Sequence, residues 1–441
     1  MKQQKIHFIA IGGAAMHNLA LDLASQGHIV TGSDDEIYEP SLGRLKDAGI
    51  APIKFGWYPQ KITKDLDAVI LGMHAKDENP ELVRALDLGI KVFSYPEYIF
   101  HHSINKKRIV IAGSHGKTTT TAMILHVLSH LHWDFDYLVG AQLQGFDRMV
   151  KVSNAPLIVM EGDEYLSSAI DRVPKIHHYR PHIAVITGIA WDHINVFPTF
   201  DFYKEQFSIF VDTMPDDATL IYYSEDANLA DIVQTKSKVK TIPYFSLAVN
   251  EQKQVFLDNK VYPISIIGHH NLQNMNAARL VCAALGIDND TFFASIADFS
   301  GASKRLQKLS DSNGRLVYLD FAHAPSKVAA TTQAFKAWFG NSRLLAVLEL
   351  HTFSSLNPEF IVQYKNSLNP ADEAIVFYNE HTLKMKNMPP LDAAFLIKSF
   401  GHNNMKIFTD ELALHQYINT KKEENILLMT SGNFNKMKLD F

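Results

Sequence analysis

The stretch RIVIAGSHGKTTTT (Arg108–Thr121) decides the fold of the middle of this chain. An apolar run leads into two glycines, Gly113 and Gly116, which are followed by a lysine and four threonines. The pattern G-x-x-G-K-T is a shortened form of the phosphate loop G-x-x-x-x-G-K-[ST]. A strand, a glycine turn and a helix N-terminus together surround phosphates with backbone N–H groups and the positive end of a helix dipole. The stretch therefore predicts a nucleotide-binding turn in a parallel α/β domain.

The residues of this turn are expected to have separate tasks. Lys117 would place a positive charge on the terminal phosphates, and Thr118 would offer its hydroxyl to Mg²⁺. The competing interpretation is a glycine turn before a threonine-rich helix, with no ligand. The ATP contacts expected here come from Gly113, Ser114, His115, Gly116, Lys117, Thr118 and Thr119.

Acidic residues and a histidine follow the next two apolar runs. IVMEGDE places Glu161 and Glu164 directly after an apolar run, and AVITGIAWDH places His193 after the following one. The carboxyl ends of parallel strands meet at the edge of a sheet where ligands bind. Strand-end acids are also common on solvated surfaces, so the phosphate loop beside them is what favours function. At least one of the two glutamates, together with His193, is predicted to be a metal ligand.

A second glycine turn lies near the start of the chain, in IAIGGAAM (Ile9–Met16). In the dinucleotide fingerprint G-x-G-x-x-G, the first and last glycine positions hold Ala10 and Ala15 here, and only the middle position holds a glycine, Gly12. Asp34 stands about 20 residues further on, where a ribose-binding acid is expected. The turn is therefore predicted to bind phosphate, although its glycines depart from the dinucleotide fingerprint.

Composition limits the class of protein. A chain of 441 residues exceeds one hydrophobic core, and 46% hydrophobic with 20% charged residues is ordinary for a globular protein. A net charge of −5 without a dense basic run argues against nucleic acid. One cysteine, Cys282, excludes an internal disulfide framework. No apolar run is long enough to span a bilayer, and no signal core opens the sequence, so a cytoplasmic protein without a membrane partner is expected.

Short β-rich runs alternate with helical stretches, a pattern typical of parallel α/β domains. We expect three: a Rossmann-like N-terminal domain (1–105), a central ATP-binding domain with a mostly parallel sheet (106–299), and a Rossmann-like C-terminal domain (300–441). The polar stretch 101–108 is interpreted as a linker. The β-rich stretch 219–268 is interpreted as an antiparallel flank.

Several separated motifs resemble those of the Mur ligases, ATP-dependent enzymes that form amide bonds in peptidoglycan synthesis. In chain order they are GSHGKTTTT, EGDEY, the WDH strand end, GHHNLQN, the KRL of ASKRLQKL, DFAHAP and SGNF. The resemblance covers essentially the whole chain and implies ATP and Mg²⁺ as cofactors. It implies that Thr118, Glu161 and His193 hold Mg²⁺ and that Asn271, Arg305, Asp320 and His323 contact or lie close to ATP. From the residues alone, Asn271 can equally be a helix cap.

The start of the chain is similar to the N-terminal domain of those members that take UDP-N-acetylmuramate. The matching stretches are IGGAAM and GSDD. With an ATP loop elsewhere, Gly12 and Gly13 need no dinucleotide and can let the backbone approach the diphosphate of a UDP-sugar. The UDP-sugar contacts expected are Gly12, Gly13, Ala14, Met16, Ser33, Asp34, His178 and Arg180.

Two activities of the family compete. One joins L-alanine to UDP-N-acetylmuramate, and the other joins the recycled tripeptide L-alanyl-γ-D-glutamyl-meso-diaminopimelate to the same acceptor. EGDEYLSSAIDRVPKIHHYRP (161–181), DFAHAP and AVLEL favour the tripeptide, whereas ELHTFSS matches neither pattern cleanly. We therefore expect a peptide ligase of peptidoglycan recycling that is a monomer or homodimer, with the L-alanine ligase as the alternative.

The resemblance also implies the chemistry. ATP phosphorylates the lactyl carboxylate of the acceptor, and the amine then displaces phosphate, with Lys117, Glu161, His193 and Arg305 as catalytic residues. Some relatives carry a carbamylated lysine, but its position falls nearer Ser208 than Lys204, so none is expected. A P-loop ATPase or kinase with a dinucleotide-binding domain, and a non-catalytic nucleotide-binding regulator, are alternatives from other classes that leave the third-domain motifs unexplained.

Overall fold

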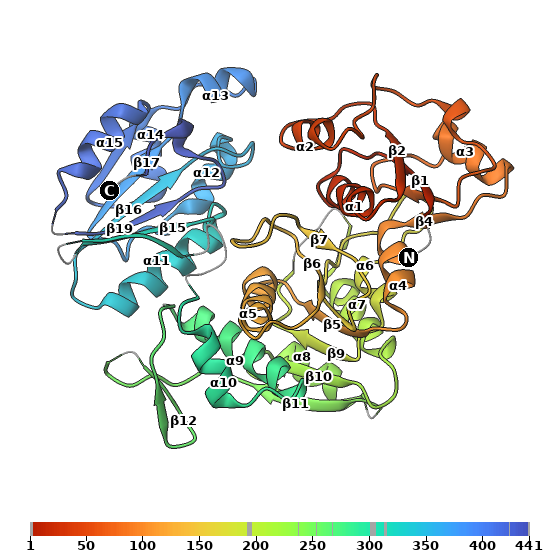
Figure 1. The fold of residues 1–441 in the computed structure, drawn as a ribbon. Coiled ribbons are helices and arrows are strands. Elements are labelled where there is room, and N and C mark those ends of the chain that lie inside the picture. Colours follow the sequence, from red (N-terminus) through yellow and green to blue (C-terminus); the bar gives the residue numbers. More distant parts are fainter. Residues whose placement is uncertain are drawn as a thin grey trace. The chain divides into compact units, whose positions relative to one another are not determined.

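Figure 1 shows a computed structural model of the chain, which divides into two compact units. One unit comprises Met1–Ile264 with Gln273–Ala297, and the other comprises Ser265–Leu272 with Asp298–Phe441. The structure describes residues 3–191, 196–236, 238–252, 254–266, 268–299, 306–312, 315–422 and 424–439. The α/β prediction is confirmed, because each of the three large sheets is wholly or mostly parallel.

The N-terminal part of the first unit is a four-stranded parallel sheet in the order β2-β1-β3-β4. Its middle strands are buried apolar runs, as a sheet covered on both faces requires. Helix α3 begins where the Asn79 side chain accepts bonds from two free N–H groups of the first turn. The elements are β1 (Lys5–Ile9), α1 (Ala14–Ser25), β2 (Ile29–Ser33), α2 (Ser41–Asp47), the 3₁₀ helix η1 (Pro59–Lys61), β3 (Ala68–Leu71), α3 (Pro80–Asp87), β4 (Val92–Ser94) and α4 (Tyr95–Ser103).

The central part of the same unit holds a seven-stranded sheet in the order β11-β10-β9-β5-β8-β6-β7, parallel except at the β6–β7 edge. Its central strands are fully apolar in their middle residues and buried. The elements are β5 (Lys107–Ala112), α5 (Lys117–His130), β6 (Asp136–Leu138), β7 (Val150–Lys151), β8 (Leu157–Glu161), α6 (Lys175–Tyr179), β9 (Ile183–Ile186), α7 (Phe200–Asp212), β10 (Thr219–Tyr223), α8 (Ala227–Gln234), β11 (Lys240–Tyr244), the hairpin β12 (Val255–Leu257) and β13 (Lys260–Tyr262), α9 (His269–Ala284) and α10 (Asn289–Ile296).

The predicted linker at 101–108 is wrong. Helix α4 continues to Ser103, and β5 already begins at Lys107. Two charged residues of this stretch, Lys106 and Arg108, are buried because they have partners: Arg108 donates to the carbonyls of Ser103 and Tyr179, and the Lys106 ammonium pairs with Asp136.

Two further expectations need correction. The stretch 219–268 is not wholly an antiparallel flank, because β10 and β11 extend the parallel sheet and only the β12–β13 hairpin is antiparallel. Asn271 is not the helix cap, because α9 starts at His269 and the N–H groups of Asn271 and Leu272 bond to the Gly268 carbonyl.

The second unit contains a six-stranded sheet in the order β14-β15-β19-β16-β17-β18, parallel except for β14 against β15. Apolar clusters cover both faces, with α11 and α14 contributing to one and α15 to the other. In such doubly wound sheets, ligands bind beyond the carboxyl ends of the strands. The elements are β14 (Gln307–Ser312), β15 (Arg315–Asp320), α11 (Pro325–Phe339), β16 (Leu344–Glu349), α12 (Pro358–Ile361), η2 (Val362–Tyr364), β17 (Glu373–Phe377), α13 (Glu380–Met385), α14 (Ala393–Phe400), β18 (Met405–Phe408), α15 (Glu411–Asn419), β19 (Asn425–Met429) and η3 (Phe434–Lys436).

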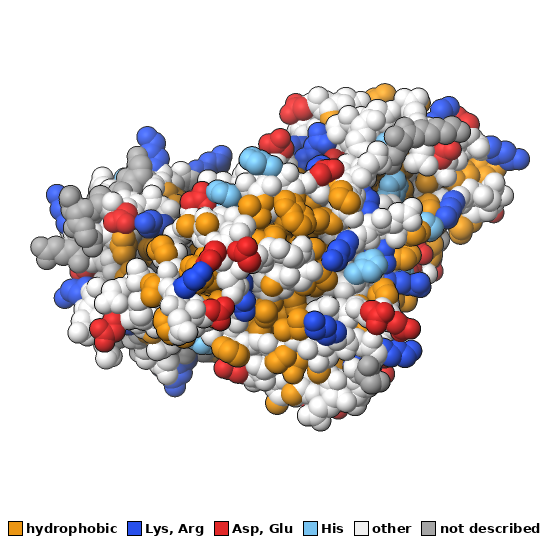
Figure 2. Space-filling model, turned by 60° about the horizontal axis from the view of Figure 1, so that its bottom comes forward, with side chains coloured by type: hydrophobic (Ala, Val, Ile, Leu, Met, Phe, Trp, Pro, Cys, Tyr) orange, Lys and Arg blue, Asp and Glu red, His pale blue; other side chains and the backbone are white. Residues whose placement is uncertain are grey.

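The face drawn in Figure 2 carries acidic and basic side chains interspersed with apolar ones. Among the described residues, no helix combines the length and the apolar character that crossing a bilayer requires. The single cysteine, Cys282, is buried on α9, and burial raises the pKa of its thiol to about 12. The thiol is therefore protonated at neutral pH.

Candidate active site

The glycine turn between β5 and α5 has the shape that the sequence predicts. Gly113 and Gly116 have φ angles of 117° and 82°, which L side chains rarely adopt. A Cβ on Gly113 would collide with the Thr187 hydroxyl, and one on Gly116 with the Asn274 amide oxygen. Both positions therefore require glycine, and the turn lies directly against the end of β9 and the helix α9.

The turn is anchored to the residues that follow β9. The Ser114 N–H donates to the Gly188 carbonyl at 2.9 Å, and its hydroxyl donates to the Ala190 carbonyl at 2.7 Å. The Thr187 hydroxyl donates to the His115 carbonyl. These bonds fix the backbone of the turn before any ligand binds, which lowers the entropic cost of binding phosphates.

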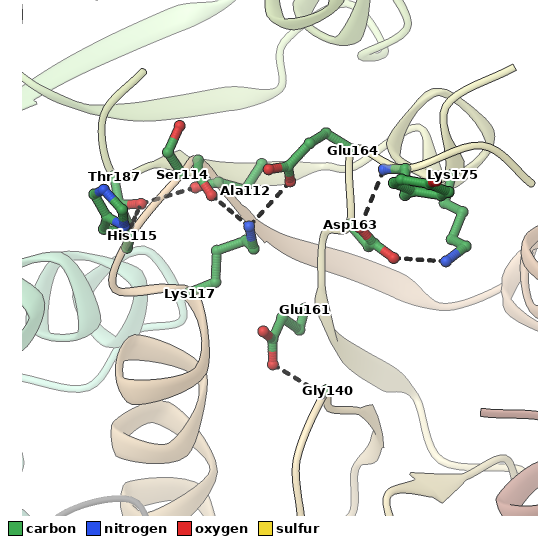
Figure 3. Close-up of polar contacts among 12 residues, drawn as sticks. Ala112, Ser114, His115, Lys117, Gly140, Glu161, Asp163, Glu164, Lys175 and Thr187 are labelled. Atoms are coloured by element: carbon green, nitrogen blue, oxygen red, sulfur yellow. Dashed lines mark hydrogen bonds and ion pairs between the residues drawn. The ribbon is translucent and has the colours of Figure 1, made fainter. Parts of the chain in front are cut away.

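Lys117 is held in place by a buried carboxylate (Figure 3). Its ammonium donates to the Gly113 carbonyl at 2.6 Å and to Glu164 Oε2 at 3.0 Å. Glu164 is 1% exposed, and its other oxygen accepts a hydrogen bond from the Tyr203 hydroxyl at 2.9 Å. A carboxylate buried this deeply is tolerated because it is paired and hydrogen-bonded. The consequence is that the ammonium is fixed over the turn.

Glu161, the last residue of β8, faces the first turn of α5. One carboxylate oxygen accepts a bond from the Thr118 hydroxyl at 2.7 Å, and the other accepts one from the Gly140 N–H at 2.8 Å. A hydroxyl beside a carboxylate is an oxygen donor set that suits Mg²⁺. The predicted pair of Thr118 and Glu161 is thus brought together, whereas His193, the third predicted ligand, lies outside the described residues.

Asp163 has a different partner from its neighbours. Burial acts to raise the pKa of this carboxyl, but the Lys175 ammonium at 2.6 Å outweighs burial and holds the pKa below its usual range. Lys175 therefore neutralises Asp163. Each acid of the EGDE stretch consequently has its own partner: Glu161 bonds to the Thr118 hydroxyl, Asp163 pairs with Lys175, and Glu164 pairs with Lys117.

The N-terminal turn joins β1 to α1 through Gly12 and Gly13. The Gly12 N–H donates to Asp34 Oδ2 at 2.7 Å, and a Cβ on Gly12 would lie 2.9 Å from that same oxygen. Burial is the main reason why the pKa of Asp34 rises to about 6. Ser33 ends β2 and Asp34 follows it at the carboxyl edge of the sheet, next to the start of α1. Ala14 is the first residue of that helix, and Met16 is buried in the apolar core.

His178 and Arg180, also predicted to contact the UDP-sugar, lie at the end of α6. His178 Nε2 is 2.8 Å from Asp171 Oδ2, and the Arg180 guanidinium lies 5.3 Å from the centroid of the Phe100 ring on α4. His178 thus contacts the segment between β8 and α6, and Arg180 contacts α4. A role in binding the sugar nucleotide stays a prediction for both.

The C-terminal candidates are described within the second unit. Asp320 ends β15, is buried, and accepts bonds from the N–H groups of Leu306 and Ala322, each at 2.8 Å. His323 Nδ1 lies 2.8 Å from the Phe321 carbonyl. Arg305 lies outside the described residues. The ATP contacts of these residues and of Asn271 stay predictions.

Sequence reasoning missed two amides of α9 that lie at the phosphate loop. Asn274 lies beside Gly116, and Gln273 Nε2 donates to the Thr187 carbonyl at 3.3 Å. The amide-rich start of the helix was a signal for both, but only the fold shows which amide faces the turn. Lys204, considered as a carbamylation site, instead pairs with Asp231 at 2.9 Å.

A phosphate loop on a parallel sheet, with a carboxylate at the next strand end and two further parallel sheets, defines a nucleotide-binding α/β protein. Three Mur ligase domain models match the chain: the Mur ligase family catalytic domain at 5–106, the Mur ligase middle domain at 111–282 and the Mur ligase glutamate ligase domain at 304–434. The chain belongs to the Mur ligase family, and it is an ATP-dependent, amide-forming ligase of peptidoglycan synthesis.

Individual relatives divide between two activities. The UDP-N-acetylmuramate–L-alanine ligase of Caldicellulosiruptor saccharolyticus is 31% identical over 84% of this chain and 83% of its own length, and others at 27–29% identity carry the same name. A UDP-N-acetylmuramate:L-alanyl-γ-D-glutamyl-meso-diaminopimelate ligase from Neisseria meningitides is 25% identical, with a TM-score of 0.61, over 67% of this chain and 98% of that structure. The UDP-N-acetylmuramate–alanine ligase of Thermotoga maritima shares the fold, with 22% identity and a TM-score of 0.70 over 99% and 97% of the two chains.

Proposed function

We propose that this ligase joins L-alanyl-γ-D-glutamyl-meso-diaminopimelate to UDP-N-acetylmuramate, with release of ADP and phosphate. The observation that carries the choice of the tripeptide is the loop after β16, Leu350–Leu356. It contains neither lysine nor arginine, and His351 is its only titratable residue. The residue before it, Glu349, is buried and is already bonded to the Phe434 N–H at 2.9 Å and to the Thr430 hydroxyl.

The charge of the amino substrate explains why this loop matters. Free L-alanine has a carboxylate on the carbon that bears the attacking amine, so its site needs a cation close to the reaction. In the tripeptide that carboxyl is an uncharged amide, and the free carboxylates lie further along the peptide. The loop after β16 lies at the carboxyl end of a parallel strand, where ligands bind. Because it has no lysine or arginine, it suits the uncharged amide of the tripeptide better than the carboxylate of L-alanine.

One cation, Lys386, does lie beside this loop, next to its residue Phe353. The Lys386 ammonium, just after α13, lies 4.2 Å from the centroid of the Phe353 ring. Phe353 is 61% exposed, so the pair faces solvent. We assign Lys386 to a distal carboxylate of the peptide.

The acceptor and ATP have separate sites in this proposal. The Gly12–Gly13 turn at the N-terminus of α1 receives the diphosphate of UDP-N-acetylmuramate. The turn before α5, with Lys117, receives the phosphates of ATP. Thr118 and Glu161, with His193 as the third predicted ligand, would hold Mg²⁺, which when bound neutralises phosphate charge.

The reaction then needs positioning more than covalent help from the protein. A lactyl carboxylate oxygen attacks the γ-phosphorus and ADP leaves, which gives an acyl phosphate. The peptide amine attacks the acyl carbon, the C–O bond to phosphate breaks, and the amine loses a proton as the amide forms. Lys117 neutralises charge that develops on the transferred phosphoryl group.

The L-alanine ligase is the second candidate, and a specific observation favours it. The curated relatives with 27–31% identity, over most of the chain, are named for that activity. In this case the cation near the carboxylate of L-alanine would have to be His351 or a residue outside the β16 loop.

An ADP-release assay with UDP-N-acetylmuramate and different amines separates the candidates. We expect the tripeptide to stimulate ADP release far more than L-alanine does. Full turnover with L-alanine alone would assign the second candidate. ADP release that needs neither an amine nor the sugar nucleotide would contradict both.

A further inference from the structure

We propose that Asn18, Asp22 and Gln26 are positioning residues that fix the UDP-sugar turn relative to the ATP loop. They act through Gly140–Val152, the segment that connects β6 to β7 and includes β7. We call this segment the tie. The inference rests on the proposed separation of the two nucleotide sites, and it assigns to helix α1 a role in the phosphoryl-transfer step in addition to binding.

The three residues form one stripe along α1: Asn18 and Asp22 lie within the helix, and Gln26 is the C-cap residue directly after it. A spacing of four residues places them one above another on the same face of the helix. Asn18 Oδ1 accepts a bond from the Met149 N–H at 3.0 Å, Asp22 Oδ2 accepts one from the Val152 N–H at 2.9 Å, and the Gln26 amide donates to the Val152 carbonyl. All three side chains therefore bond to the backbone of the tie.

The bonded stretch is the edge of the central sheet. β7 is the last strand of its sheet and pairs with β6 alone, so its outer backbone groups need other partners. The stripe supplies partners to Met149 and Val152, the residues that flank β7 on either side. At this edge of the sheet, helix α1 from the N-terminal part of the unit thus lies where a further strand could pair.

Asp22 is the costly member of the stripe. Its side chain is 7% exposed, and burial raises its pKa despite the Val152 N–H and the Arg148 guanidinium at 3.3 Å. A buried carboxylate disfavours folding unless hydrogen bonds and an opposite charge offset its loss of solvation, as the Val152 N–H and Arg148 do here. Here it fixes the register of α1 against the tie.

The other end of the tie reaches the ATP site. The Gly140 N–H donates to Glu161 Oε2 at 2.8 Å, and a Cβ on Gly140 would lie 3.1 Å from the Glu161 carboxylate (Figure 3). Glu161 in turn accepts the Thr118 hydroxyl. One continuous segment is therefore bonded to α1 at one end and to the ATP site at the other.

Helix α1 carries the UDP-sugar turn at its own first residue. The Gly13 carbonyl accepts the first helical bond, from the His17 N–H at 2.9 Å. A shift of α1 against the tie would therefore move the acceptor relative to the γ-phosphate. In-line transfer is sensitive to such a shift, because an error of about 1 Å can cost roughly 100-fold in rate.

The test compares Asp22→Ala with Asp22→Asn, which keeps an oxygen that can accept the Val152 N–H. The matched control is Asp87→Ala, since Asp87 lies exposed on α3. We expect Asp22→Ala to lower kcat about 10-fold or more, with the calorimetric Kd values for UDP-N-acetylmuramate and for a non-hydrolysable ATP analogue within about twofold of wild type. Asp22→Asn should restore most of kcat, and Asp87→Ala should match wild type.

Hydrogen exchange gives a readout without turnover. UDP-N-acetylmuramate should slow amide exchange in residues 140–152 of the wild-type protein but not in Asp22→Ala. The inference is overturned if Asp22→Ala turns over normally, or if it loses binding and Tm together and Asp22→Asn restores neither. It is also overturned if wild-type protein binds the sugar nucleotide without any change in the tie. A wild-type protein that neither binds UDP-N-acetylmuramate nor turns it over would instead refute the proposed function.

Discussion

The Lys117 ammonium lies 3.0 Å from the carboxylate of Glu164, which is buried behind the phosphate loop. The two residues belong to different strand–helix units of one sheet, since Lys117 opens α5 and Glu164 follows β8. The lysine that is expected to meet the phosphates of ATP therefore has its orientation set by Glu164, whereas Glu161, the other candidate metal ligand of this stretch, bonds to Thr118.

Glu164→Gln should lower kcat for ADP release roughly 10-fold, because Lys117 loses the charge that orients it. Gln retains an oxygen that can accept the Tyr203 hydroxyl, so Tm should change little. Steady-state kinetics and thermal unfolding check this prediction. Tyr203→Phe is the companion variant, and it should lose less activity than Glu164→Gln. Wild-type kinetics in Glu164→Gln would show that the ion pair has no part in the reaction.

Lys117→Ala should reduce turnover by about 100-fold or more, since it removes the charge that stabilises the transferred phosphoryl group. Binding of UDP-N-acetylmuramate should be unchanged, because the Gly12–Gly13 turn follows β1, a strand of a different sheet from β5. Isothermal calorimetry with the sugar nucleotide and the ADP assay together test this. Loss of sugar-nucleotide binding in Lys117→Ala would contradict two separate nucleotide sites.

Asp34 should make stability depend on pH. Its folded pKa of about 6 exceeds the ordinary value of 3.8, so the folded protein holds the proton more tightly than the unfolded chain. The stabilising contribution is present below about pH 4 and is lost as the pH rises through 6. Asp34→Asn lacks this dependence, so its Tm relative to wild type should increase between pH 4 and pH 7.

The exposed Asp47→Asn, at the end of α2, is the control for Asp34→Asn and should show a constant Tm difference over the same range. Thermal unfolding followed by circular dichroism at several pH values is sufficient. A Tm difference for Asp34→Asn that decreases as the pH rises would mean that the carboxylate is stabilised in the folded protein.

Lys386→Ala should discriminate between amino substrates. We expect about a 10-fold lower kcat/KM for the tripeptide, because a charge-assisted bond to its distal carboxylate is lost. L-Alanine, which has no distal carboxylate, should be used as poorly as before. Lys384→Ala, on the exposed side of α13, is the control. Equal kcat/KM for the tripeptide in Lys386→Ala and wild type would place the peptide elsewhere.

The parts of the fold that sequence predicts best are those set by local pattern. The strand, turn and helix around Gly113–Lys117 are contiguous, and two left-handed glycines leave few alternatives. Arg108 shows where this reasoning fails. Its charge suggested a solvated linker, but carbonyl partners as distant as Tyr179 allow it to be buried.

The same holds for the candidate site: residues at strand ends could be predicted from the sequence, and residues on later helices could not. Thr118 and Glu161 come together because parallel strands bring their carboxyl ends to one edge of the sheet. Tyr203 and Asn274 reach the site from helices that follow later in the chain, and no local spacing marks them. Their roles depend on how helices pack, which a motif does not encode.

The bond between the Gly12 N–H and Asp34 has a consequence for competition among cellular metabolites. In a dinucleotide-binding fold, an acid at this place accepts the ribose hydroxyl of NAD. Here the Asp34 carboxylate is engaged within the protein, with Gly12 on one of its oxygens. A pyridine nucleotide entering this turn would have to share the carboxylate with the Gly12 N–H. The bond therefore weakens the turn's hold on the ribose of a redox cofactor and leaves the backbone N–H groups at the start of α1 for the diphosphate of the enzyme's own acceptor.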